Sequence, residues 1–141
     1  MPKLGACVRQ IDALGEPTGL AYGPDGLLYV AESLAHRVNV IDAEGKSKRT
    51  IGAERLVDPR DVAVCADGRV VVSDAGLDAI VIFAPDGKSS VIGKIGGEPG
   101  QFSAPEGIDV AGDWIAVADS RNDRVQVMKL DGSLARVIGY R

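Results

Sequence analysis

Apolar residues occupy alternate positions in short segments of the chain, and glycine turns separate these segments. Residues 37–41, 79–83 and 124–128 are the clearest examples, and an acid–glycine pair closely follows each of them. No segment places apolar residues at helical spacing over ten or more positions. Period-two patterning with such turns is typical of strands joined by hairpins. The sequence therefore predicts an all-β fold.

The strand pattern occurs three times. Pro17, Pro59 and Pro105 mark equivalent points that lie 42 and 46 residues apart. An inner strand follows each proline (20–22, 62–64, 108–110), and a second strand ends in an acid (Glu32, Asp74, Asp119). A third strand comes next, and a fourth ends in Ile-Gly. Four strands per repeat without a helix are typical of β-propeller blades.

The repeats divide the chain, which we treat as a single domain over residues 1–141, into three predicted blades. These are residues 14–52, 53–93 and 94–141, and the inner strand of each is expected to line a central channel. Residues 5–12 align with residues 45–52, the fourth strand of the first blade. Residues 1–13 are therefore predicted to supply one extra outer strand, which belongs to a preceding blade or to a partner's blade.

The third repeat carries a recognisable motif. Residues 118–128 (ADSRNDRVQVM), preceded by 105–110 (PEGIDV), resemble the NHL repeat. The second repeat departs from that pattern at Asp78-Ala79, and the first has Glu32 in place of Asp. The resemblance implies a propeller that usually has six blades, about twice the number encoded here.

Three blades leave two sheet faces uncovered, and each blade of a propeller normally packs against two neighbours. The exposed apolar area would exceed what a soluble monomer tolerates. We expect a second copy of the chain to cover these faces in a homodimer with six blades. Completion by other subunits, or by the rest of a longer chain, remains open.

Composition and charge narrow the partners and the compartment. The chain has 141 residues, 45% of them apolar, and a net charge of −4, which makes nucleic acid an unlikely partner. The longest apolar run, residues 79–84, is too short to cross a membrane. Residues 1–9 do not resemble a secretory signal, and Cys7 and Cys65 lack CxxC spacing. The cytoplasm is favoured, unless the chain is a fragment of a secreted protein.

Acid and arginine positions recur at the ends of the second and third strands. Arg37 and Arg124 follow Glu32 and Asp119 by five residues, whereas Asp74 has no such arginine. The same spacing in the first and third repeats favours structural pairing over catalysis. His36 is the single histidine, and no set of partners for general base catalysis or zinc binding accompanies it. We predict no catalytic residues.

Metal binding is a second possibility at the inner strands. Asp61 and Asp109 are the candidate ligands, and carboxylates of this kind suit Ca²⁺ or Mg²⁺. Asp is also frequent in turns, where its side chain bonds to nearby backbone N–H groups. The turn interpretation is favoured, and no cofactor is predicted.

Recognition is expected at the loops between the second and third strands, because loops on a rigid scaffold carry binding function. Candidate residues of this rim are Ser33, His36, Asp78, Ser120, Arg121, Asn122 and Asp123. We expect a protein or peptide ligand. The alternative is a hydrolase or lyase with a metal in the channel, and RNA binding through Arg60, Arg121 and Arg124 is third. Trp114 begins a strand, where we expect it to pack.

Overall fold

The computed structural model describes residues 14–139. This part of the chain forms three four-stranded antiparallel sheets, with strand orders β1-β2-β3-β4, β5-β6-β7-β8 and β9-β10-β11-β12. It contains no α-helix, and a single 3-10 turn, η1, covers Ser120–Asn122. The strands are β1 (Pro17–Tyr22), β2 (Leu28–Glu32), β3 (Arg37–Ile41), β4 (Ser47–Ile51), β5 (Pro59–Val64), β6 (Val70–Asp74), β7 (Ala79–Phe83), β8 (Ser89–Ile92), β9 (Pro105–Ala111), β10 (Trp114–Asp119), β11 (Arg124–Lys129) and β12 (Leu134–Gly139).

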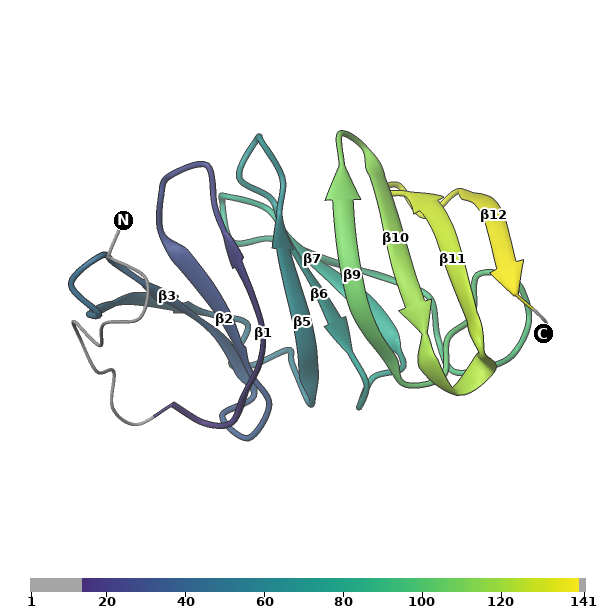
Figure 1. Cartoon of the computed structure of the whole chain (residues 1–141), viewed down its shortest axis with the longest axis horizontal. Helices are drawn as coiled ribbons and strands as arrows, with labels where there is room; N and C mark the ends of the chain where they lie inside the picture. The colour runs from purple at the N-terminus through teal and green to yellow at the C-terminus, as the bar shows by residue number, and fades with distance from the viewer. Residues whose placement is uncertain (1–13, 140–141) are drawn as a thin grey trace, which may run out of the picture.

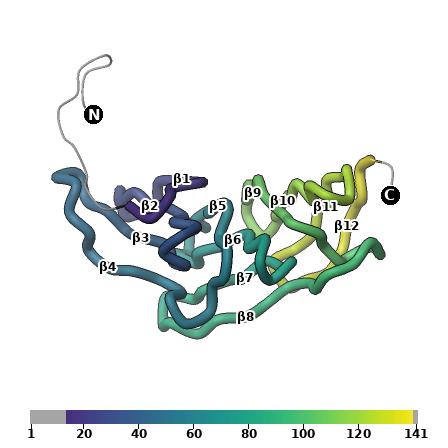
Figure 2. The backbone as a smooth tube through the Cα atoms, turned by 90° about the horizontal axis from the view of Figure 1, so that it is seen from below, coloured from purple at the N-terminus to yellow at the C-terminus, as the bar shows by residue number. Residues whose placement is uncertain are grey.

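Each sheet is one propeller blade, and we number the blades 1 to 3 in chain order. The blades stand side by side in an arc (Figure 1). The inner strands lie next to one another, β1 beside β5 and β5 beside β9. Figure 2 shows these strands along one edge of the arc and β4 and β8 along the opposite edge. The predicted all-β fold, with four antiparallel strands per blade, is confirmed.

The hairpins form where the sequence supplies turn residues. Gly26 and Gly68 adopt φ values of +80° and +91°, a left-handed conformation that glycine adopts without strain. The side chains of Asp25 and Asp67 accept hydrogen bonds from the backbone N–H groups of Leu27 and Arg69. These turns fix the register of the first two strands in blades 1 and 2.

Two hydrophobic cores lie between the blades. The core between blades 1 and 2 includes Tyr29 and Val40 from blade 1, with Val62 and Phe83 from blade 2. The core between blades 2 and 3 includes Val71, Ile80, Phe102, Ile115 and Met128. Each blade therefore has a front face, directed toward the preceding blade, and a back face, directed toward the following one.

A large apolar side chain from each inter-blade connection completes these cores. Leu56 and Phe102 stand three residues before Pro59 and Pro105, and their exposed fractions are 5% and 0%. A β-carbon at Gly52 would lie 2.7 Å from Leu56, and one at Gly93 would lie 2.5 Å from Phe102. The glycine that follows each fourth strand thus makes room for the apolar residue of the next connection.

The two ends of the arc expose apolar side chains. On the front face of blade 1, Leu20 and Tyr22 are 64% and 67% exposed, while Val30 farther out is buried. On the back face of blade 3, Ile138 and Trp114 are 52% and 42% exposed. The expectation that Trp114 packs was wrong, because its strand turns it away from blade 2.

The sequence-based predictions also concerned the N-terminal residues and the two cysteines. The predicted extra strand over residues 1–13 lies outside the described residues, and so does Cys7. Cys65 belongs to the core between blades 2 and 3, where burial raises the pKa of its thiol. None of the helical segments in residues 14–139 has the length and apolarity needed to cross a membrane.

We predict that Phe102→Ala destabilises the protein by about 3–5 kcal/mol, because it leaves a cavity in a closed core. Urea unfolding at a fixed protein concentration measures this change. Ile95→Ala is the matched control, because Ile95 lies in the same connection and is 68% exposed. The control is expected to change the free energy of unfolding by less than about 0.5 kcal/mol. Equal losses in both variants would contradict the role assigned to Phe102.

Candidate functional site

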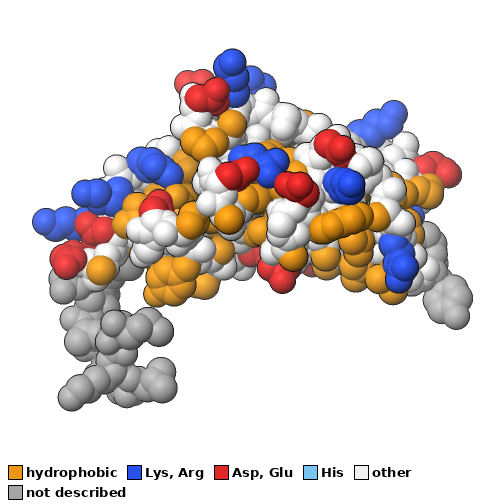
Figure 3. Space-filling view, turned by 90° about the horizontal axis from the view of Figure 1, so that it is seen from above, with side chains coloured by type: hydrophobic (Ala, Val, Ile, Leu, Met, Phe, Trp, Pro, Cys, Tyr) orange, Lys and Arg blue, Asp and Glu red, His pale blue; other side chains and the backbone are white. Residues whose placement is uncertain are grey.

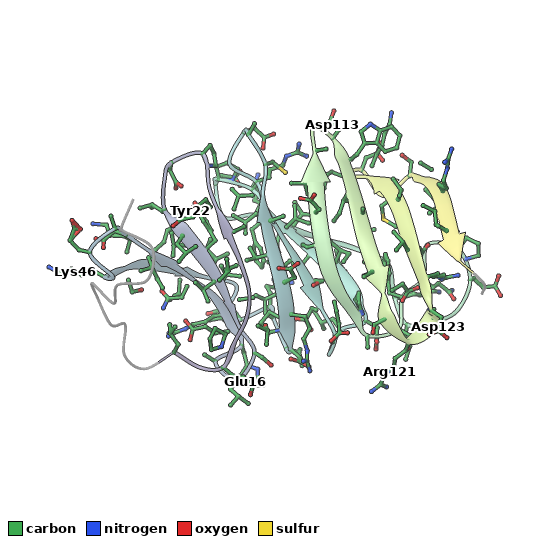
Figure 4. The ribbon with its side chains drawn as sticks, viewed as in Figure 1. Glu16, Tyr22, Lys46, Asp113, Arg121 and Asp123 are labelled. Atoms are coloured by element: carbon green, nitrogen blue, oxygen red, sulfur yellow. The ribbon has the colours of Figure 1, made fainter. Side chains whose placement is uncertain are left out.

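The loops at the lower edge of the arc in Figure 1 form the candidate site, which we call the lower rim. It comprises loops 33–36, 75–78 and 120–123, which join the second and third strands. It also includes segments 14–16, 57–58 and 103–104, which lead into the inner strands. Figure 4 shows Glu16, Arg121 and Asp123 on this rim, with Asp113 on the opposite one.

Asp74 organises the rim of blade 2. Its side chain is fully buried and accepts four backbone hydrogen bonds at 2.7–3.0 Å. Two come from Val57 and Asp58, just before the inner strand, and two from Gly76 and Leu77 in the adjoining loop. One carboxylate therefore joins the connection between blades to the loop beside it.

Asp119 has the same place in blade 3 and a larger network. It accepts a hydrogen bond from the backbone N–H of Ser103 at 2.8 Å and from the side chain of Arg124 at 2.8 Å. Asn122 and Gln126 also donate to it. The Arg124 guanidinium in turn donates to the carbonyl oxygens of residues 97, 98 and 101. This network holds the longer connection that precedes β9.

Glu32 occupies the equivalent position in blade 1 with fewer contacts. Its Oε2 accepts a hydrogen bond from the backbone N–H of Gly15 at 2.7 Å and lies 3.4 Å from Arg37. Its Oε1 is buried and has no hydrogen-bond partner among the described residues. In all three blades the acid thus bonds to the N–H located two residues before the inner-strand proline.

Further rim contacts cross from one blade to the next. The Ser33 hydroxyl donates to Asp58, and the His36 ring lies within hydrogen-bond distance of the carbonyl oxygen of Val57. Burial raises the pKa of Asp58, but hydrogen bonds from Ser33 and Arg60 outweigh this effect, and the net pKa lies below its ordinary value. The blades are therefore joined at the rim as well as through their cores.

The junction between blades 2 and 3 has an equivalent contact. Asp78 accepts a hydrogen bond from the backbone N–H of Ala104 at 2.8 Å. Asp78 occupies the same loop position as His36, and both have left-handed backbones, with φ values of +52° and +56°. The loop position before the third strand therefore makes the inter-blade contact in both junctions.

The structure divides the predicted rim residues into two groups. Ser33, Asp78 and Asn122 form internal hydrogen bonds, whereas Ser120, Arg121 and Asp123 are exposed. His36 combines an exposed ring with its contact to Val57.

Exposed apolar residues on the rim were missed by sequence reasoning. Leu34, Val57 and Leu77 are 69%, 47% and 36% exposed. His36 contacts Val57 from the loop that carries Leu34, and Val57 lies beside Gly76, the neighbour of Leu77. The signal for these residues in the sequence is that apolar side chains occur in otherwise polar turn segments. We call Leu34, Val57 and Leu77 the apolar rim patch.

The carboxylates proposed as metal ligands have other contacts. Both side-chain oxygens of Asp61 accept backbone hydrogen bonds, from Val62 and from Ile108 of the next blade. Burial raises the pKa of Asp61, and the charge of Asp109 adds to this rise. Within residues 14–139, no three His, Cys, Asp or Glu side chains gather in a way that suits a metal ion. Asp61 thus serves as a contact between blades.

The basic group suggested for RNA binding does not form. The side chain of Arg124 is 1% exposed, and Arg60 forms an ion pair with Asp58 at 2.8 Å. Figure 3 shows acidic and basic side chains interspersed on the upper surface, with hydrophobic ones gathered along one edge.

Solved propeller structures share this fold. Virginiamycin B lyase from Staphylococcus aureus superimposes with a TM-score of 0.67 at 19% identity, over 86% of this chain and 40% of the lyase. A gluconolactonase from Xanthomonas campestris gives a TM-score of 0.70 at 19% identity, over 92% of this chain and 50% of the enzyme. At these identities the likeness concerns the fold alone.

No protein-family model matches the chain. It is 32% identical over 135 residues to the E3 ubiquitin-protein ligase NHLRC1 of Rattus norvegicus, covering 88% of this chain and 33% of the ligase. The human NHLRC1 is 32% identical over 125 residues, or 84% of this chain and 30% of the ligase. The chain belongs to the NHL-repeat β-propeller family. It spans about a third of the length of these NHL-repeat relatives.

We predict that Asp74→Asn destabilises this NHL-repeat protein by about 2–4 kcal/mol, because an amide cannot accept all four backbone hydrogen bonds. Urea unfolding monitored by circular dichroism measures the change. Asp86→Asn is the control, since Asp86 lies in an exposed turn where the amide oxygen still accepts the bond from Lys88. If Asp74→Asn loses no more stability than Asp86→Asn, the buried carboxylate does not hold the rim together.

Proposed function

We propose that this chain is half of a six-bladed NHL propeller, which pairs with a second copy and presents its rim to a protein or peptide. The observation that carries the pairing is the exposed apolar surface at both ends of the arc. Leu20 and Tyr22 at one end, and Trp114 and Ile138 at the other, are 42–67% exposed. The equivalents of Leu20 and Ile138 inside the arc pack in or against the inter-blade cores; they are Val62, Ile108, Ile51 and Ile92.

The size of the chain supports this ring. The superposition covers 50% of the gluconolactonase chain and 40% of the lyase chain. Two copies would therefore supply about one closed ring, and closure would cover both exposed ends at once. Repeat proteins gain stability from each interface between neighbouring units, so two further interfaces favour the closed form.

The apolar rim patch supports a protein or peptide ligand. Its three apolar residues are exposed on loops that buried acids hold in place, and rigid loops of this kind are suited to recognition. A net charge of −4 and the burial of Arg124 disfavour a nucleic acid. The similar NHLRC1 proteins are named ubiquitin-protein ligases, and an enzyme of that name acts on proteins. This chain spans about a third of those ligases.

We predict a mass of twice 14.7 kDa for the native chain in sedimentation equilibrium at micromolar concentration. Burial of apolar surface drives this association, so the dimer is expected to persist at high salt. Small-angle scattering is expected to report a ring rather than an elongated particle. A monomer that stays folded and stable at these concentrations would refute the self-assembly.

The binding function is tested with a random peptide display library selected on the native protein. We expect the selected peptides to bind Leu34→Asp and Leu77→Asp at least about tenfold more weakly, because a charge replaces an apolar contact. Ile95→Asp is the control, since Ile95 is equally exposed outside the apolar rim patch. Failure to select peptides, or equal binding to all variants, would refute the patch as a ligand site.

A further inference from the structure

We propose that the second copy docks head to tail, so that the front of blade 1 meets the back of blade 3 in the register that joins the blades within the chain. This inference rests on the proposed self-assembly and specifies its interface. It also assigns a role to Asp123, whose exposed carboxylate forms no hydrogen bond or ion pair within residues 14–139.

The front faces of the three blades present equivalent side chains. Val62 packs between blades 1 and 2, and Ile108 packs between blades 2 and 3. Leu20 holds the same position in blade 1, two places before Tyr22 on the same face, and it is 64% exposed. The inner strand of blade 1 therefore exposes the side chains of an inter-blade surface, whereas Val30 and Ile41 farther out on the same face are buried.

The back faces show the same relation. Ile51 and Ile92, which end the fourth strands of blades 1 and 2, pack against the two cores. Ile138 is their equivalent in blade 3 and is 52% exposed. With Trp114, Val127 and Arg136 it lines a shallow hollow of about 360 Å³ on this face. An apolar side chain from a front face fits the chemistry of this hollow.

The inter-blade connections point to a second contact. Leu56 and Phe102 pack beside Gly52 and Gly93, the glycines that follow the preceding fourth strands. Leu14 stands three residues before Pro17, as Leu56 stands before Pro59. Gly139 is the matching glycine of blade 3, with a positive φ of +117° like the other two. In the head-to-tail ring, Leu14 of one copy packs beside Gly139 of the other.

The lower rim supplies a polar contact between the two copies, which repeats a contact found between blades within the chain. Asp78 accepts a hydrogen bond from the backbone N–H of Ala104, the residue before Pro105. Asp123 is the equivalent of Asp78, and Glu16 is the equivalent of Ala104. The two acceptors have φ values of +52° and +53°, and the two donors have +49° and +57°. Asp123 is thus shaped to accept the N–H of Glu16 from the second copy.

The positions of these residues in the arc allow the contact. Figure 4 shows Glu16 and Asp123 on the same rim, Glu16 beside the inner strand of blade 1 and Asp123 in blade 3. Rotation by 180° about an axis parallel to the inner strands keeps each rim on its own side. Two copies related in this way bring Asp123 of each to Glu16 of the other, so the closed ring contains every contact twice.

The test uses one variant blocked at each end. The front variant carries Leu20→Asp and Tyr22→Asp. The back variant carries Ala116→Arg and Ile138→Asp; Ala116 lies on the back face of blade 3, two places after Trp114 in β10. Circular dichroism and thermal unfolding verify that both remain folded. We expect each variant alone to be a monomer at micromolar concentration. An equimolar mixture is expected to form a heterodimer, because one intact front still meets one intact back.

The matched control is Val91→Asp on the outer strand of blade 2, where Val91 is 57% exposed but distant from both ends. It is expected to leave the native dimer unchanged. A front variant that still dimerises alone, or a mixture that stays monomeric, would overturn the head-to-tail interface while the self-assembly of the native chain stands. A monomeric native chain would overturn both.

Asp123→Gly tests the polar contact separately. Glycine keeps the left-handed backbone at this position and removes the carboxylate. We expect the dimer dissociation constant to rise about ten- to hundredfold, since a charge-assisted hydrogen bond is lost at each interface. Glu44→Gln, an exposed acid in the β3–β4 turn, is the control. An unchanged dissociation constant for Asp123→Gly would overturn the role of Asp123.

Discussion

The backbone N–H groups that lead into each inner strand have no partner in the sheet, and a buried carboxylate at the end of the second strand accepts their hydrogen bonds. Asp74 bonds to Val57 and Asp58, Asp119 to Ser103, and Glu32 to Gly15. Leaving such donors unpaired inside the protein would cost about 1–3 kcal/mol each. Because each connection crosses from one blade to the next, the same bonds also fix the distance between neighbouring sheets.

The three blades meet this constraint with different residues. Blade 2 uses backbone donors alone around Asp74, since Ala79 stands where the other blades have arginine. Blade 3 has a longer connection before its inner strand. The Arg124 guanidinium holds this connection by donating hydrogen bonds to the carbonyl oxygens of residues 97, 98 and 101. Blade 1 has the longer Glu32 and the fewest contacts among the described residues. The hydrogen bond between the acid and the N–H two residues before the proline therefore recurs in all three blades, whereas the other partners of the acid differ.

The arrangement separates stability from recognition. Buried acids and inter-blade cores hold the loops rigid, which leaves Leu34, Val57 and Leu77 free to face solvent at the rim. Stacking of equivalent surfaces also explains the exposed ends, because every blade carries a front and a back whether or not a neighbour covers it. When blades are stabilised only by contacts with their neighbours, the two end blades keep an uncovered face unless the ring closes. That geometry underlies both the proposed ring and its head-to-tail interface.

The sequence by itself determined the repeat, the four strands of each blade and the structural use of Glu32, Asp74 and Asp119. These features are local, since alternation, turn residues and fixed spacing act within about forty residues. Only the tertiary structure decided which side chains meet across blades. In the folded chain Asp61 accepts a hydrogen bond from the backbone N–H of Ile108, Arg124 is buried and Trp114 is exposed. The residues of the apolar rim patch come from separate loops. Such contacts depend on the twist and spacing of whole sheets, which no single repeat encodes.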